Sequence, residues 1–137
     1  MGEKISQLIA MLDQLPEAQA KSLIERLFQQ NPMVAVQVIT RQFGFGDLVY
    51  ASTEGLKALR ERTTDETLQC ALNGSPEVLI KGFTKHMKTD EAMRFVDGLY
   101  QRRVSDQQIK SAQQKVLVQA FLLHRKGRLK LSRPRLD

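Results

Sequence analysis

Two histidines and one cysteine are the side chains of this chain best suited to acid–base, metal or nucleophilic chemistry. His86 and His124 each stand near the expected end of a helix, where the helix dipole stabilises a protonated imidazole. The sequence has no His-x-x-x-His pair or His/Asp/Glu cluster, so this capping interpretation is favoured over metal binding or proton transfer. Cys70 lies beside Ala71 and Leu72 without a nucleophile motif, which favours a small core side chain.

Glycines and carboxylates offer no stronger catalytic pattern. Gly44-Phe45-Gly46 lacks the third glycine of a dinucleotide-binding fingerprint. The pairs Asp65-Glu66 and Asp90-Glu91 fall on expected first helical turns, where capping and solubility explain them. No nucleophile, base and oxyanion-stabilising group occur together. We therefore expect no catalytic residue, no metal site, no cofactor and no enzymatic activity.

The positive charge of the chain is concentrated at its C-terminal end. The 137 residues carry a net charge of +6, with 42% apolar and 26% charged residues, as is typical of a folded domain. Residues 1–124 hold 15 Lys and Arg against 14 Asp and Glu, and the remaining six basic residues follow. This basic segment is either a solvated tail or a nucleic-acid-binding segment. The second interpretation is weaker, because the segment has no interleaved aromatic residues and the chain has no helix suited to reading bases. The basic residues of this segment are Arg125, Lys126, Arg128, Lys130, Arg133 and Arg135.

The elements that would position these residues are helices, and the first three form one unit. Apolar side chains recur at spacings of three and four through residues 5–15 and 16–30, as on one face of a helix. Asn31-Pro32 is typical of a helix start. Residues 33–43 could form a strand, because Val residues alternate there, but the helical neighbours favour a helix. No apolar run is long enough to span a membrane and the N-terminus lacks a signal-peptide pattern, so we expect a cytoplasmic protein.

Residues 1–42 therefore predict a three-helix unit of about the size of an armadillo repeat, which has ~40 residues. One such repeat cannot bury both of its faces alone, because repeats are stabilised by stacking on neighbours. The unit predicts a docking surface, filled by the rest of the chain, by another copy or by a partner. Residues 43–46, with two glycines, predict a hinge.

Residues 47–131 predict a second helical domain. We expect a short helix in which Leu56, Leu59 and Val49 point inward, and a capping box of Thr63 and Glu66 before the next helix. Gly74 and Gly127 predict left-handed helix stops. We expect Ser75 to cap a helix over Pro76–Met87, and Thr89 to cap a helix over 90–101 in which Met93, Val96 and Leu99 point inward. A Ser105/Gln108 capping box should open the longest helix. An extended segment 129–131 and a basic disordered tail at 132–137 should follow that helix.

Four ordered motifs resemble the C-terminal part of the flagellar motor switch protein family FliG. They cover about residues 4–131, and each is weak alone, but four in one order are fairly specific. The motifs are Phe43-Gly44-Phe45-Gly46-Asp47-Leu48, Ala71-Leu72-Asn73-Gly74, Lys85-His86-Met87 and Ala112-Gln113. In that family they match a Met-Phe-x-Phe hinge followed by Glu-Asp-Leu, an Ala-Leu-Lys-Gly turn, an Asn-Met-Ser helix end and an Ala-Gln-Lys stretch.

The resemblance implies an all-α scaffold: an armadillo-like three-helix unit joined by a Phe-Gly-Phe hinge to a C-terminal helical domain. FliG-like proteins belong to the rotor at the cytoplasmic base of the flagellum and act by protein–protein interaction in motility and chemotaxis. Their C-terminal domain presents a charged helix to the stator, and their armadillo units stack between subunits. The implied partners are flagellar switch or rotor proteins, or self-association through residues 1–42. The implied hinge residues are Gln42, Phe43, Gly44 and Phe45.

Departures from the family concern mainly the charges of the stator-facing helix. The lysine of the Leu-Lys-Gly turn is Asn73, and an arginine after the Asn-Met-Ser motif is Asp90. Of two paired acids only Asp97 remains, because the second position is Gly98. An arginine before the last helix falls on Ser105, although Arg102 and Arg103 are near. By resemblance, Asp97, Arg102 and Arg103 are the stator-facing residues, and the chain resembles an accessory or degenerate paralogue without the usual torque-generating charges.

Overall fold

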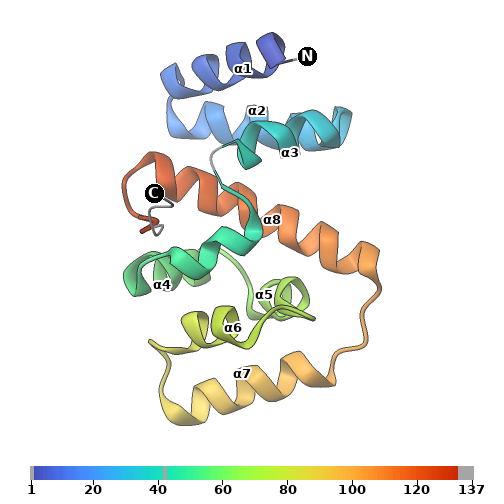
Figure 1. The fold of residues 1–137 in the computed structure, drawn as a ribbon, viewed down its shortest axis with the longest axis vertical. Coiled ribbons are helices and arrows are strands. Elements are labelled where there is room, and N and C mark those ends of the chain that lie inside the picture. The colour runs from blue at the N-terminus through green and yellow to red at the C-terminus, as the bar shows by residue number, and fades with distance from the viewer. Residues whose placement is uncertain (1, 42, 133–137) are drawn as a thin grey trace, which may run out of the picture. The chain divides into compact units, whose positions relative to one another are not determined.

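The protein is all-α in the computed structural model, as the sequence predicts. The structure describes residues 2–41 and 43–132. Figure 1 shows the order of the helices along the chain. The helices form two compact units, Met1–Gly44 (unit 1) and Phe45–Asp137 (unit 2). Across the described ranges, β structure amounts to one isolated antiparallel bridge, between Ala51 and Leu131.

Unit 1 contains α1 (Gly2–Gln14), α2 (Glu17–Gln30) and α3 (Pro32–Thr40). The Asn31 side chain accepts a hydrogen bond from the Val34 amide at 3.4 Å, and Pro32 occupies the first helical position. These contacts explain why the Val-rich segment is a helix rather than a strand, because the start of the helix is fixed locally. All three helices pack against one another.

The apolar side chains of unit 1 are only partly buried. Its fully buried side chains come from all three helices: Ile5, Leu12, Ala20, Ile24, Ala35, Val38 and Ile39. Further apolar positions on the predicted stripes are half-buried: Leu8, Ile9, Leu15, Leu23, Leu27 and Phe28. Met11 and Met33 are 47% and 72% exposed. Unit 1 therefore leaves parts of its apolar stripes and two methionines in contact with solvent.

Unit 2 is built around its longest helix. It contains η1 (Phe45–Tyr50), α4 (Thr53–Glu61), α5 (Asp65–Leu72), α6 (Glu77–Thr84), α7 (Thr89–Gln101) and α8 (Asp106–Arg125). α8 packs against α4 and α5, and α7 packs against α5 and α6. The one short helix expected after the hinge is two elements, because Ser52 lies in extended backbone and its hydroxyl caps α4. Leu56 and Leu59 are buried as expected, and Val49 is half-buried.

Three predicted helix starts were wrong, each by one residue. The cap of α5 is Thr64, whose hydroxyl accepts from the Thr67 amide at 3.1 Å, while Thr63 bonds back to α4. α6 begins at Glu77 after Pro76, so Ser75 is not its cap. α7 begins at Thr89, which is therefore inside the helix. Two adjacent threonines compete for the cap only at α5, whereas Pro76 and Lys88 stand at the N-cap positions of α6 and α7 without a side-chain hydrogen bond to the helix.

The Ser105/Gln108 capping box and both glycine stops are confirmed. The Ser105 hydroxyl accepts from the Gln108 amide at 3.2 Å, and the Gln108 side chain accepts from the Ser105 amide at 2.8 Å. Gly74 and Gly127 have φ values of +78° and +72°, which side chains rarely tolerate. After Gly127 the chain runs back along residues 50–52 and buries Leu129 completely. The predicted extended segment 129–131 is confirmed at Leu131, which pairs with Ala51, whereas Leu129 lies in a bend; the segment belongs to the folded unit.

Candidate functional site

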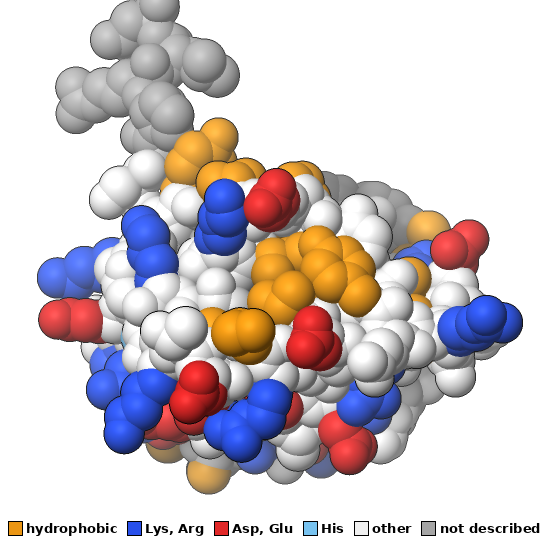
Figure 2. All heavy atoms as spheres, turned by 90° about the horizontal axis from the view of Figure 1, so that it is seen from below, with side chains coloured by type: hydrophobic (Ala, Val, Ile, Leu, Met, Phe, Trp, Pro, Cys, Tyr) orange, Lys and Arg blue, Asp and Glu red, His pale blue; other side chains and the backbone are white. Residues whose placement is uncertain are grey.

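The outward face of α7 is the candidate interaction surface that the resemblance points to. Phe95 and Leu99, four residues apart, are 3% and 1% exposed and pack inward. Met93 and Tyr100 are 61% and 67% exposed on the opposite side, with Asp97 between them at helical spacing. Figure 2 views this end of unit 2 and shows hydrophobic side chains gathered in its middle, with charged side chains around them. The prediction that Met93 points inward was wrong.

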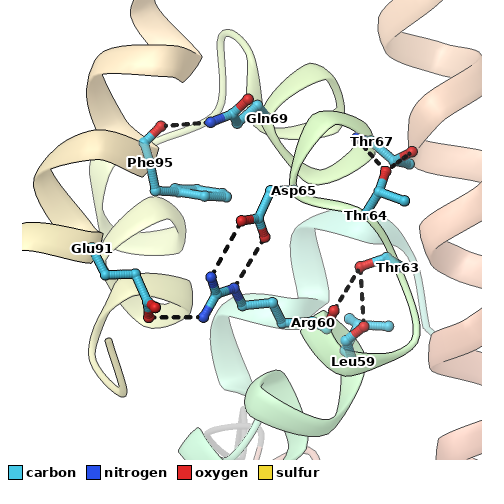
Figure 3. Close-up of polar contacts among 9 residues, drawn as sticks. All are labelled: Leu59, Arg60, Thr63, Thr64, Asp65, Thr67, Gln69, Glu91 and Phe95. Atoms are coloured by element: carbon cyan, nitrogen blue, oxygen red, sulfur yellow. Dashed lines mark hydrogen bonds and ion pairs between the residues drawn. The ribbon is translucent and has the colours of Figure 1, made fainter. Parts of the chain in front are cut away.

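An arginine holds the first turn of α7 in place. The guanidinium of Arg60, on α4, donates to both carboxylate oxygens of Asp65 at 3.1 and 3.3 Å. Its remaining nitrogen donates to Glu91 of α7 at 3.0 Å. Figure 3 shows the guanidinium between the two carboxylates. Hydrogen bonding to Asp65 raises the pKa of Arg60, so its charge is fixed at any physiological pH. Arg60 therefore ties three helices together.

A buried glutamine holds the middle of α7. Gln69 of α5 is 7% exposed, and its amide nitrogen donates to the Phe95 carbonyl at 3.1 Å. Its amide oxygen accepts from Nε of Arg102 at 2.9 Å. Both bonds compensate the cost of burying a polar amide. A Cβ at Gly98 would lie 2.5 Å from the same amide nitrogen, so glycine leaves the room that Gln69 occupies.

Three of the four charge departures coincide with positions that hold the fold together. Asn73 donates to the carbonyls of Leu99 and Arg102, both at 3.4 Å, and so binds the C-terminal end of α7. Gly98 admits Gln69, and Ser105 caps α8. At these positions the residues serve contacts within unit 2. The fourth, Asp90, is exposed on the first turn of α7, where a carboxylate suits the helix dipole.

The three residues assigned to the stator-facing helix by resemblance lie in different settings. Asp97 and Arg103 are exposed. Arg102 is half-buried and uses its Nε to bind Gln69, so part of its guanidinium is engaged within the domain. Arg60 and Gln69 were missed by the sequence analysis. A glutamine between the apolar residues of α5 and a glycine inside α7 were the available signals for the second of these contacts.

The predicted hinge residues lie at the division between the two units. Gln42 falls outside the described residues. The Phe43 amide donates to the Ile39 carbonyl at 3.1 Å, which extends the α3 hydrogen-bond pattern, and its side chain is 1% exposed. Gly44 ends unit 1, and Phe45 begins η1. The part of the hinge between the units is thus very short, and its movement stays a prediction.

Four of the six basic residues at the C-terminal end stand on ordered backbone rather than in a tail. Arg125 ends α8, and Lys126, Arg128 and Lys130 follow on the segment that returns to residues 50–52. Nδ1 of His124 lies 3.0 Å from the Leu129 carbonyl. Because a carbonyl only accepts, this nitrogen carries a hydrogen and closes the return turn. Arg133, Arg135 and the predicted disordered tail 132–137 fall outside the described residues, apart from Ser132, which pairs with Tyr50.

The remaining chemistry-bearing side chains are placed as follows. Cys70 is half-buried, and its thiol donates to the Gln108 carbonyl at 3.4 Å. The imidazole of His86 lies beside α4, and burial, followed by the Arg60 and Lys57 cations, lowers its pKa. A lowered pKa disagrees with the expected stabilisation of a protonated His86 by a helix dipole, because desolvation outweighs that effect. Within residues 2–41 and 43–132 no three metal-binding side chains come together, and no helix is long and apolar enough to cross a membrane.

Comparison with known proteins identifies the family from sequence. The model of the FliG C-terminal domain family matches residues 25–131. The flagellar motor switch protein FliG of Thermotoga maritima is 24% identical over 124 residues, which are 90% of this chain and 37% of that protein. The chain thus spans little more than a third of this relative.

Solved structures of FliG share the fold. A crystal structure of part of FliG from H. pylori matches 89% of this chain and 58% of its own, with a TM-score of 0.63 and 22% identity. Full-length FliG from Aquifex aeolicus matches 90% of this chain and 39% of its own, with a TM-score of 0.63 and 20% identity. The order of helices in both units is therefore one already seen in solved proteins.

Proposed function

Because this chain belongs to the FliG C-terminal domain family, we propose that it is a non-enzymatic protein of the flagellar motor switch that acts by protein–protein interaction. The match over residues 25–131 carries the proposal, since it includes both α7 and part of unit 1. Its place of action is the cytoplasmic face of the flagellar basal body. The nucleic-acid alternative gains no support from the relatives, whose printed names describe a motor switch protein.

Unit 1 is the docking unit in this proposal. Its half-buried stripe and the exposed Met11 and Met33 leave apolar surface that a second helical unit would cover. The partner is a flagellar switch or rotor protein, or a second copy of this chain. The short connection at residues 43–46 would let unit 2 reorient while unit 1 stays docked.

The outward face of α7 sets this chain apart from a torque generator. Its centre is apolar, with Met93 and Tyr100 beside Asp97, and the exposed Asp90 and Arg94 lie toward its N-terminal end. Charges at the rim of an interface steer association, so their loss weakens recognition of a charged partner. We therefore propose an accessory or degenerate paralogue that binds the rotor without engaging the stator in the usual way.

A binding assay with a surface variant tests this function. Purified full-length chain would be immobilised and mixed with purified switch proteins from the same bacterium, and separately with itself. We expect capture of one of them, and we expect Met33→Glu to weaken it, because a charge would enter the apolar surface. Gln37→Glu is the matched control, since it adds the same charge at an exposed position of the same helix. Equal binding by both variants would reject unit 1 as the docking unit.

A chimera tests the second part of the proposal. Residues 45–131 would replace the equivalent region of a working motor switch protein, and swimming of the resulting cells would be recorded. We expect a protein that joins the rotor but does not drive rotation. Normal swimming would show that the apolar face of α7 supports torque and would contradict the accessory role.

A further inference from the structure

His86 occupies an unusual position in the turn between α6 and α7. The residue as a whole is half-buried, but both ring nitrogens are shielded from solvent, and neither has a hydrogen-bond partner among the described residues. A neutral imidazole carries one donor and one acceptor, and a protonated one carries two donors. Leaving such groups buried and unpaired is costly, and it is rare in folded proteins. The two ring nitrogens of His86 could therefore form hydrogen bonds that the described structure does not contain.

The charged groups around His86 make its protonation unfavourable. From α4, Lys57 and Arg60 oppose a positive charge, and Glu61 favours one. From α7, Glu91 favours it, but this carboxylate already accepts a 3.0 Å bond from Arg60. Lys85 and Lys88 flank the histidine in sequence. Burial is the largest effect, and together with the two cations of α4 it lowers the pKa of His86.

We propose that the protonation state of His86 controls the contact between the α6–α7 turn and α4, which we call the corner. With a neutral imidazole the corner is closed and Arg60 binds Glu91. With a proton on the ring, a third cation lies beside Lys57 and Arg60 and two N–H donors need partners. The imidazolium then leaves its buried position or draws Glu91 away from Arg60, and either movement frees the first turn of α7. This device concerns unit 2 alone and holds whether or not the chain serves a motor.

Titration of the full chain by NMR tests the proposal, with its two histidines as probe and reference. Ring signals of His86 and His124 would be followed between about pH 5 and 7.5, the range in which histidine titrates. We expect the His86 midpoint below about 6.5, the value of an unperturbed imidazole. Relative to the intrinsic exchange rate at each pH, amide exchange at residues 85–91 should accelerate as His86 protonates, by up to about tenfold per pH unit for one proton. A midpoint at or above 6.5, or exchange that ignores the titration, would overturn the proposal.

Variants separate His86 from general effects of acid. His86→Asn removes the titrating ring, so the pH-dependent exchange at residues 85–91 should disappear, whereas His124→Asn should retain it. Persistence of the step in His86→Asn would reject the assignment. Lys57→Met is a milder test at an exposed position, and it should raise the His86 midpoint by removing one opposing cation. Lys110→Met, an exposed position on α8, is its control and should leave the midpoint unchanged. An equal shift in both lysine variants would contradict the proposed geometry.

Discussion

Replacement of Gly98 by alanine tests the polar contact that holds α7 against α5. In an ordinary helix this change is stabilising by about 0.5–1 kcal/mol, because glycine is the poorer helix former. Here the new Cβ would lie 2.5 Å from the Gln69 amide nitrogen and 3.1 Å from its amide carbon. The end of a glutamine side chain can rotate away, so the main cost is not a clash. It is the loss of the two hydrogen bonds that the buried amide makes.

The magnitude follows from those two bonds. The bond from Gln69 to the Phe95 carbonyl joins neutral groups and contributes about 0.5–1.5 kcal/mol. The bond from Arg102 involves a charged donor and contributes about 1.5–3 kcal/mol, which we take at the lower end because Arg102 is partly solvated. Subtraction of the gain in helix propensity leaves a net destabilisation of about 1–2.5 kcal/mol. For a domain of this size, each kcal/mol lowers Tm by about 4–8 °C.

Intrinsic fluorescence provides the assay for unit 2 alone. The chain has no tryptophan and only two tyrosines, Tyr50 and Tyr100, both in unit 2. Urea unfolding followed by tyrosine emission therefore reports this unit without a contribution from unit 1. The midpoint should fall in Gly98→Ala while the slope of the transition stays the same, as expected for a change in stability rather than compactness.

A second background decides whether Gln69 is the cause. In a Gln69→Ala chain the space beside residue 98 is empty, so Gly98→Ala should now stabilise the protein by up to about 1 kcal/mol. The effect of one substitution thus changes sign between the two backgrounds, which is the signature of direct coupling. Stabilisation in the native background, or the same destabilisation in both, would refute the reasoning.

Three further outcomes follow from named contacts. Arg60→Met should destabilise unit 2 by about 1–2 kcal/mol in urea unfolding, less than a fully buried charge pair, because its carboxylate partners are partly exposed. Ser105→Ala should lower the free energy of unfolding by about 1 kcal/mol, because it removes a helix cap. Thr89→Ala, inside α7, should lower it by only about a few tenths of a kcal/mol, and equal decreases would contradict the helix starts described above. Because the pKa of His86 is lowered on folding, the unfolded chain binds its proton first. The free energy of unfolding should therefore fall as pH drops below about 6.5. In His86→Gln this part of the pH dependence should be absent when the same measurement is repeated.

The fold was predictable from the sequence where one residue fixes a local conformation. Asn31 and Ser105 bond amides three residues ahead, and Gly74 supplies a backbone angle that other residues resist. Local patterns were insufficient for α7, because apolar residues occur around most of the helix. Met93 and Phe95 are equally plausible core residues until α5 and α6 are placed, and the structure buries Phe95.

The candidate site was less predictable, because its contacts join distant residues. Arg60 and Glu91 are 31 positions apart, and Gln69 and Arg102 are 33 apart, with no spacing rule linking them. The family resemblance directed attention to the charges that α7 lacks. It did not explain why other residues stand at those positions. The structure supplies reasons for two of them: Asn73 makes hydrogen bonds to α7, and Gly98 leaves space for Gln69.

Sedimentation of the intact chain with the full-length motor switch protein of the same bacterium is the most direct test of the proposed role. The account predicts a complex heavier than either component, weakened by Met33→Glu and preserved by Gln37→Glu. If the two proteins sediment independently, and the chain alone is a monomer at every concentration, the docking role of unit 1 is contradicted.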